Sequence, residues 1–512
     1  MAQPTSLLQD VRGFARDFPR DRMPEGLLWD MADFIPALLD AQLTGRGGWR
    51  WGSAVLPAKI DGGLHATFKS GDRLLVVAGT NIYQVSMVDG SISPTPLALP
   101  GTIVQNPVLL GDQVIVAHTG QAVPKVVTAT ASAMNIANAG AGAPTGKYST
   151  VYKGRVLVSG GTGNEEKIYF SPPRDALVAW DATRSWEGTS LPLTGLGALR
   201  GMILAFHAGS VERLRGSEPA HEGNPEGDMN LENLFDRAGC GDAKSIAYWN
   251  DNCIFADERG VHLTDGAIVK NMISQGGLVS FWRTLFLNRI SIAAETYLDY
   301  YVVTIIRSDG VSITLICDLQ RRSWFRFSNI KSNAYIRSYG TQEQLWGGRT
   351  PDNRLMQLAD CFFPIRGAAL IADADATPVL PVVETGWNRL GEEGRKRIRF
   401  LYTSYDIRTT PITAPAKYDV PVEGLAEAVN GEAKAALAQL LEVSYALSPF
   451  ASPSQFIVAG VLPETSDYDR FRLPVNRQPY GISVKFRQTA PSTVTRIAEF
   501  GVEAQATERS RL

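Results

Sequence analysis

The residues around Lys147 have the composition of a phosphate-binding loop. The segment GAPTGKYST begins at Gly142 and places a glycine directly before Lys147. Such a loop needs its first glycine where Ala141 stands, and a serine or threonine where Tyr148 stands. Because both positions fail, we interpret the segment as a loop between repeated units, and we predict no nucleotide site there.

The segment DADATPVLPVVE, from Asp373 to Glu384, has acids at the first, third and twelfth positions of a calcium-binding loop. The sixth position of that loop makes a sharp turn that needs glycine, and here it is Pro378. Proline has a fixed φ and cannot make this turn. We therefore predict that these acids are solvated residues of a linker.

The remaining candidates for chemistry are scattered. None of the five histidines has a second ligand at metal spacing, and no hydrolase or metalloprotease motif occurs. The isolated acids Asp257, Glu258 and Asp318 would have to converge in space to act together. We predict no catalytic residue, no metal site and no cofactor, and we expect structural roles for the histidines, which are His65, His118, His207, His221 and His262.

One basic cluster, Arg395, Lys396, Arg397 and Arg399, alternates around Ile398 and Phe400. A solvated strand face is the simpler interpretation. The alternative is a contact with DNA phosphates or with an acidic partner, which would be salt-sensitive. The pair Arg321 and Arg322, just before Trp324, has the same two interpretations.

The main organising feature is a two-strand unit that recurs about every 40 to 50 residues. Each copy is a β-rich apolar run, a turn of Gly, Asp or Asn, and a second alternating run, as in a hairpin. We interpret each copy as the inner half of a propeller blade. The copies begin at Leu74, Val114, Val156, Met202, Cys253, Tyr301 and Gln344.

One blade cannot bury its own faces, so the copies must pack side by side and close into a ring. The sequence therefore predicts an all-β chain with a propeller of about seven blades, with six as the alternative, over residues 51–362. An N-terminal arm covers residues 1–50, and a C-terminal domain covers residues 363–512.

In the arm, Leu27, Leu28, Met31, Phe34, Ile35, Leu38 and Leu39 have helix-like spacing that Pro36 interrupts. We predict a short helix followed by an extended segment. An arm this apolar must pack on its own propeller or on a neighbouring subunit. The segment GRGGWRWG, residues 45–52, then enters the ring, and a strand from it could complete the last blade.

After about residue 365 the blade pattern gives way to alternating strands such as RKRIRFLYTSYDI and YGISVKFRQ. These strands predict an antiparallel β-sandwich. Between them, residues 424–442 are rich in helix formers and predict one inserted helix.

Composition sets the remaining limits. Lys plus Arg number 50 against Asp plus Glu 52, so the net charge of -2 gives no global attraction to nucleic acid or membrane. The four cysteines are far apart and predict buried free thiols. The N-terminus has no apolar secretory stretch, and no apolar run approaches the roughly 18 residues of a membrane span.

Several phrases together resemble the β-propeller hub or nozzle proteins of tailed bacteriophages, often labelled tail tubular protein B or phage stabilisation protein. These phrases cover roughly residues 30–360, and their order and spacing carry the resemblance. They are DFIP (from Asp33), RGGW (from Arg46), GRVLVSGGTGNEEKIYFSPPRDALVAW (from Gly154), LTGLGALRGMILAFHAGSVERLRGS (from Leu193), GCGDAKSIAYWNDNCIFADERGVHLTDG (from Gly239) and CDLQRRSWFRF (from Cys317).

The resemblance implies a structural virion protein of the tail, assembled in the host cytoplasm and without enzymatic activity. It implies a homo-oligomeric ring, a hexamer, below the portal and adaptor, which retains and ejects genome DNA and holds fibres or spikes. For the subunit interface we predict the apolar arm residues Phe34, Ile35, Trp49 and Trp51.

Two other functions remain open. A carbohydrate-binding propeller would gather acids and aromatic residues at one mouth of the ring, but the tryptophans recur where core packing needs them. A scaffold propeller of the WD type would repeat its Trp-Asp pair at successive blade ends. Here the pair occurs only at Trp29-Asp30 and Trp180-Asp181.

Overall fold

The structure is a computed structural model of the 512-residue chain. It describes residues 3–6, 13–19, 22–24, 27–36, 43–46, 48–130, 133–219, 227–339, 343–362, 373–375, 377, 379–385, 388–389, 396–408, 441–448, 455–462, 470–477, 481–488 and 494–506. The helix predicted at residues 424–442 lies outside these ranges, except for its last two residues. Leu441 and Glu442 begin the strand β38 (Leu441–Ala446).

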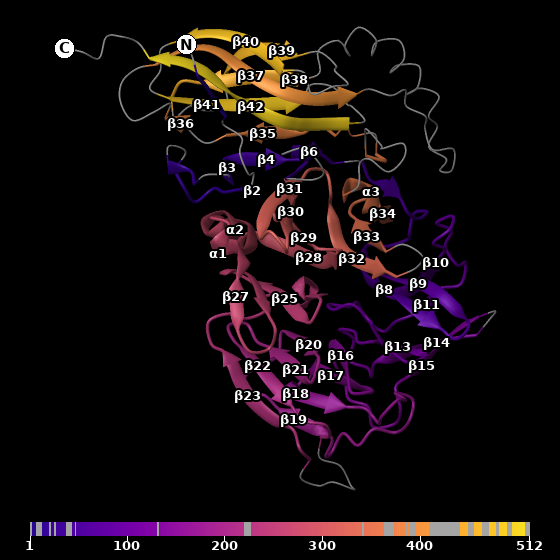
Figure 1. The fold of residues 1–512 in the computed structure, drawn as a ribbon. Coiled ribbons are helices and arrows are strands. Elements are labelled where there is room, and N and C mark those ends of the chain that lie inside the picture. The colour runs from indigo at the N-terminus through magenta and orange to yellow at the C-terminus, as the bar shows by residue number, and fades with distance from the viewer. Residues whose placement is uncertain are drawn as a thin grey trace.

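Six separate four-stranded antiparallel sheets form blades of a propeller (Figure 1). The first contains β8 (Ile60–Phe68), β9 (Gly71–Ala78), β10 (Asn81–Val85) and β11 (Leu97–Ala98). The second contains β12 (Val108–Leu110), β13 (Gln113–Val116), β14 (Lys125–Ala129) and β15 (Met134–Asn138). The third contains β16 (Tyr148–Tyr152), β17 (Arg155–Gly161), β18 (Asn164–Phe170) and β19 (Trp186–Gly188).

The fourth blade contains β20 (Gly195–Leu199), β21 (Met202–Phe206), β22 (Val211–Arg215) and β23 (Asn230–Phe235). The fifth contains β24 (Ala247–Trp249), β25 (Asn252–Asp257), β26 (Gly260–Thr264) and β27 (Val269–Asn271). The sixth separate sheet contains β32 (Ser332–Ser338), β33 (Gln344–Arg349), β34 (Arg354–Gln357) and β7 (Arg50–Trp51).

Between the last two of these sheets lies a further four-stranded unit, which is shared with the C-terminal domain. It contains β28 (Arg289–Tyr297), β29 (Tyr300–Arg307), β30 (Ser312–Asp318) and β31 (Ser323–Phe327). Its first strand contacts β24 on one side and β32 on the other. The predicted propeller is confirmed, with six separate blades and one unit that continues into a larger sheet.

The repeated hairpins are the middle strands of each unit. All seven hairpins predicted from the sequence are present, for example β9 with β10 and β33 with β34. The first strands of successive units, such as β28, β32 and β8, contact one another around the centre. The interpretation of each hairpin as the inner half of a blade is therefore wrong by one strand, because the hairpins are the second and third strands of each unit.

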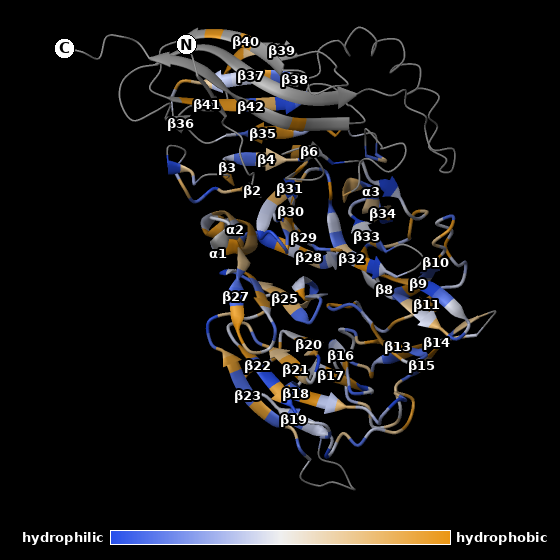
Figure 2. Ribbon diagram, in the orientation of Figure 1, coloured by the Kyte–Doolittle hydropathy of each residue, from blue (hydrophilic) through white to orange (hydrophobic). Residues whose placement is uncertain are grey.

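Burial explains why the blades close into a ring. Hydrophobic clusters lie between neighbouring blades, such as the cluster of Leu75, Val77, Ile103 and Val114 between the first and second. Strand β23 carries both hydrophobic and hydrophilic residues (Figure 2). Neighbouring blades thus bury apolar side chains against one another, which favours a closed ring.

The arm closes the propeller. Strand β7 pairs with β34, with Trp51 opposite Met356, and so supplies the outermost strand of the last blade. This confirms the predicted latch. Gly52 follows it directly, where an added Cβ would lie 2.4 Å from the Trp346 ring.

Residues 27–36 of the arm form strands, so the short helix predicted in this part of the arm is wrong. Trp29 donates its backbone N–H to Glu384 and Asp33 donates its own to Arg326, and these partners outweigh the local spacing. The arm strands are β1 (Gln3–Ser6), β2 (Gly13–Phe14), β3 (Leu27–Leu28), β4 (Asp30–Ala32), β5 (Phe34–Pro36) and β6 (Leu43–Gly45).

Two C-terminal sheets contain strands from the arm. One has the order β40-β37-β42-β6-β5, with β1 also on β42. The other is a ten-stranded sheet with the order β28-β29-β30-β31-β4-β35-β41-β38-β39, with β36 on β41. The additional strands are β35 (Val382–Glu384), β36 (Asn388–Arg389), β37 (Lys396–Arg408), β39 (Ile457–Leu462), β40 (Arg470–Arg477), β41 (Gly481–Gln488) and β42 (Val494–Ala506).

The two sheets share one hydrophobic core with the arm and the later blades, which includes Phe34, Val383, Phe486 and Ile497. In Figure 1 the arm strands (indigo) lie between the C-terminal strands (yellow and orange) and the propeller. Short helical segments flank the propeller, namely η2 (Ala243–Ser245), α1 (Met272–Gln275), α2 (Val279–Leu287) and α3 (Ala359–Phe362).

We predict that the packing of Trp49 stabilises the whole body. Its side chain is fully buried, and its ring lies edge-on to Trp51 at 4.8 Å between centroids. Trp49→Ala should lower the free energy of unfolding by about 3–5 kcal/mol, because it leaves a large cavity. Guanidinium unfolding measures this loss, and the half-buried Trp186→Ala is the control. Equal losses for the two variants would contradict the prediction.

Candidate functional site

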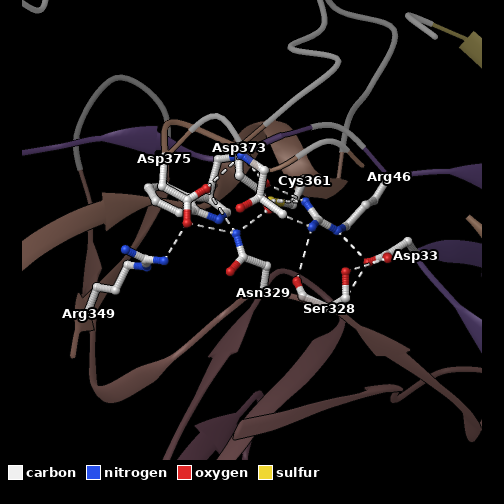
Figure 3. Close-up of polar contacts among 10 residues, drawn as sticks. Asp33, Arg46, Ser328, Asn329, Arg349, Cys361, Asp373 and Asp375 are labelled. Carbon is white, nitrogen blue, oxygen red and sulfur yellow. Dashed lines mark hydrogen bonds and ion pairs between the residues drawn. The ribbon is translucent and has the colours of Figure 1, made fainter. Parts of the chain in front are cut away.

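A buried charge network lies where the arm, the last blade and the C-terminal segment meet (Figure 3). At its centre is Arg46, whose Nε donates to Asp33 at 2.6 Å. Its two terminal nitrogens donate to the two oxygens of Asp373 at 2.8 and 2.9 Å. The guanidinium also donates to the Ser328 carbonyl at 3.0 Å and contacts the Cys361 sulfur at 3.9 Å. All five donors of the guanidinium are thus used.

The second half of the network surrounds Asn329. Its side-chain amide donates to Asp373 at 3.0 Å and to both oxygens of Asp375 at 3.1 Å. Asp375 in turn pairs with Arg349, whose guanidinium lies 5.0 Å from the centre of the Trp49 ring. The network therefore ends at Trp49, an apolar arm residue next to β7, the strand that closes the last blade.

The charges in this network are fixed by their surroundings. Burial alone would lower the pKa of Arg46, but the negative charges of Asp33 and Asp373 outweigh it and raise the pKa well above its usual value. Burial alone would raise the pKa of Asp375. Hydrogen bonds from Asn329 and Thr377, with the charge of Arg349, lower it instead.

This geometry corrects the prediction of solvated linker acids. Asp373 and Glu384 are buried, and Asp375 is half-buried. Asp373 also accepts the backbone N–H of Trp49 at 3.1 Å. The calcium-loop template drew attention to these acids for the wrong reason. The useful signal was an acid within an apolar run, together with an arginine between glycines at Arg46, since each needs a buried partner.

The centre of the propeller is crossed by polar side chains that precede β12. Gln105 donates to the Leu196 carbonyl on β20 at 2.7 Å. Its neighbour Asn106 accepts from Gly63 on β8 at 3.3 Å and donates to the Tyr335 carbonyl on β32 at 3.2 Å. Gln105 and Asn106 therefore link the blades that contain β20, β8 and β32.

Charged groups also meet across the ring. Lys244 on η2 lies 3.8 Å from Asp61 on β8. Burial lowers the pKa of Lys244, and the charge of Asp61 opposes that change. On β28, burial raises the pKa of Glu295 to about 7, while the N–H of Thr296 and the charge of Arg337 oppose the rise. The side chains near the centre of the propeller are therefore polar, and they interact with one another.

The four arm residues predicted at a subunit interface lie in the core of their own chain. Phe34 and Trp49 are completely buried, and Ile35 and Trp51 nearly so. These four residues thus have their apolar contacts within one chain. Whether these residues also serve an assembly stays a prediction.

The basic cluster lies partly within the described residues. Lys396, Arg397 and Arg399 belong to β37, which pairs with β40 and β42. Arg395 lies outside the described residues. Arg321 pairs with Asp318 at 3.2 Å on an exposed turn.

The histidines in the described ranges have polar partners. His207 lies 3.1 Å from Glu212, and His262 lies 2.8 Å from Asp257, each across one hairpin turn. Asp257 and Asp318 also accept backbone N–H groups of their own turns, for example from Gly260 and Gln320. These acids stabilise separate turns, and His221 lies outside the described residues.

The remaining predictions concern cysteines, metals, membranes and the Lys147 loop. All four cysteines are buried free thiols, as predicted. Lys147 lies between β15 and β16, the interblade position predicted for it. Within the described ranges, no three His, Cys, Asp or Glu side chains are grouped to hold a metal ion. In the same ranges, no helix has the length and apolar character needed to cross a membrane.

No family model and no curated protein matches the sequence. Among solved structures, U3-55K matches with a TM-score of 0.41 at 11% identity, over 61% of this chain and 99% of that one. A serine-to-alanine mutant of puromycin hydrolase complexed with PGG matches with a TM-score of 0.36 at 13% identity, over 66% of this chain and 61% of that one.

We predict that Arg46→Met lowers the free energy of unfolding by about 3–5 kcal/mol, because Asp33 and Asp373 would then be buried without a counter-charge. Arg46→Lys should lower the free energy of unfolding less. An ammonium keeps the positive charge but lacks the paired N–H groups with which the guanidinium bonds the carboxylates. Urea unfolding measures both. The control is Arg307→Met, which breaks a surface pair with Asp309 and should cost no more than about 1 kcal/mol. A loss for Arg46→Met no greater than this control would refute the prediction.

We also predict a pH dependence from Glu295. Its folded pKa of about 7 exceeds the unfolded value of about 4.3. The folded state therefore holds the proton more tightly, and stability falls as pH rises between these values. Glu295→Gln should reduce this fall and be more stable than wild type at about pH 8. Urea midpoints across this range measure the effect, with the exposed Glu258→Gln as control. Parallel pH profiles for wild type and Glu295→Gln would show the prediction to be wrong.

Proposed function

We propose that this chain is a structural protein of a tailed-bacteriophage tail, without enzymatic activity. In this role it forms a ring, the hub or nozzle below the portal and adaptor, through which genome DNA is retained and ejected. Fibres or spikes attach to the same ring. The proposal begins from the sequence phrases that resemble such proteins.

The observation that carries the proposal is mechanical continuity. One ten-stranded sheet runs from the propeller unit β28–β31 through arm strand β4 to the C-terminal strands β35, β41, β38 and β39. The Arg46 network joins the arm to the C-terminal segment beside it. A force applied to one end of this body is transmitted through paired strands, which suits a part of a tail.

We propose that DNA does not pass through the propeller axis, where side chains bond to one another. Gln105 bonds to the fourth blade, Asn106 bonds to the first and last blades, and Lys244 lies near Asp61 of the first blade. A duplex cannot enter without breaking these contacts. In the proposed assembly the DNA conduit therefore lies between copies of the chain. The propellers surround this conduit, and DNA does not pass through any of them.

In the assembly, the proposed partners are other copies of the chain, the adaptor or neck proteins, and fibres or spikes. Strand β37 carries Lys396, Arg397 and Arg399 and is proposed to face DNA phosphates or an acidic partner. Such a contact weakens as salt is added. The proposed location is the virion tail, with assembly in the host cytoplasm.

The test is the native mass of the full chain by light scattering, alone and with purified neck components of the particle. We expect a ring of about six copies, alone or when templated, since closed rings are the usual outcome of head-to-tail contacts. A strict monomer under both conditions would overturn the proposal. An Arg46→Lys variant that still folds tests whether a well-fixed arm is needed for the ring.

A further inference from the structure

A pocket of about 390 Å³ opens where turns of the first three blades meet, and its lining includes Lys69, Asp112, Gln113, Arg174 and Asp175. Lys69 follows β8, and Asp112 lies in the turn between β12 and β13. Arg174 and Asp175 follow β18. This volume is near the lower end of the range of about 300–1,000 Å³ typical of small-molecule sites.

Hydrogen bonds hold the base of the pocket in place. The side chain of Gln113 donates to Asp175 at 2.7 Å and accepts the backbone N–H of Ala176 at 2.9 Å. Asp175 also accepts from the backbone of Leu177 at 2.8 Å. Asp112 accepts the backbone N–H of Lys69 at 2.7 Å. The two carboxylates are thus positioned without any ligand.

Each of these carboxylates uses one oxygen in these bonds. Within the part of the chain that the structure describes, the second oxygen of Asp112 and of Asp175 has no hydrogen-bond donor. A carboxylate oxygen is a strong acceptor for a hydroxyl group. The pocket therefore presents two fixed acceptors.

The same pocket presents two cations. Lys69 and Arg174 are exposed, and neither pairs with a carboxylate among the described residues. Arg174 has a φ of 67°, which is unusual for a residue other than glycine, and its N–H is fixed by the Gly154 carbonyl at 2.6 Å. Backbone strain of this kind occurs often at binding sites.

We propose that this pocket binds an acidic sugar unit, with its carboxylate against Lys69 and Arg174 and its hydroxyl groups on the free oxygens of Asp112 and Asp175. A bare anion would use the cations but be repelled by the two carboxylates. A neutral sugar would leave the cations unpaired, and no aromatic ring lines the pocket to stack on its face. An acidic sugar uses both sets of groups. The site does not depend on the proposed tail function.

The test measures binding of galacturonic acid and N-acetylneuraminic acid to the full chain by calorimetry, against galactose and inorganic phosphate. We expect an acidic sugar to bind at least tenfold more tightly than galactose or phosphate. Lys69→Ala and Arg174→Asn should each weaken that binding at least tenfold. Asparagine tolerates a positive φ, so the second variant removes the charge without added strain.

Two controls keep the test decisive. Arg200→Ala removes an exposed cation from the corresponding turn of the fourth blade and should leave binding unchanged. Asp112→Asn should weaken the acidic sugar but not phosphate. No binding of either acidic sugar at millimolar concentration would overturn the proposal, and so would phosphate binding as tightly as the sugar. Thermal unfolding of each variant shows whether a loss of binding reflects a loss of fold.

Discussion

The ion pair between Arg46 and Asp373 joins residues that are 327 positions apart in the sequence. Burying these charges costs free energy, which is recovered only when every donor and acceptor has a partner. Apolar packing alone would tolerate several positions of the arm, whereas this guanidinium has one set of acceptors. The arm strands that pair with the C-terminal sheets and close the last blade are fixed by the same contact.

With the arm fixed, the molecule is continuous across parts that are far apart in sequence. Strand β4 lies between β31 of the propeller and β35 of the C-terminal sheet. Strand β7 completes the last blade only a few residues after Arg46. The arm is therefore the element that holds the two larger parts together.

Polar side chains have different roles inside the molecule and in the pocket between the turns of the first three blades. At the junction and along the propeller axis they bond to one another, as Asn329 does with Asp375 and Asn106 with Tyr335. These hydrogen bonds stabilise the fold. In the pocket, Lys69 and Arg174 have no carboxylate partner among the described residues. An external ligand can supply a carboxylate.

The sequence by itself determined the repeat, the all-β fold and the latch strand, because hairpin alternation and turn residues are local signals. It placed the seven hairpins correctly, and it also gave the interblade position of Lys147. The strands of the arm and the burial of Asp373 were decided by tertiary structure. Their hydrogen-bond and charge partners, such as Glu384 for Trp29 and Arg46 for Asp373, lie hundreds of residues away. No local pattern specifies such a partner, so only the folded chain brings these groups together.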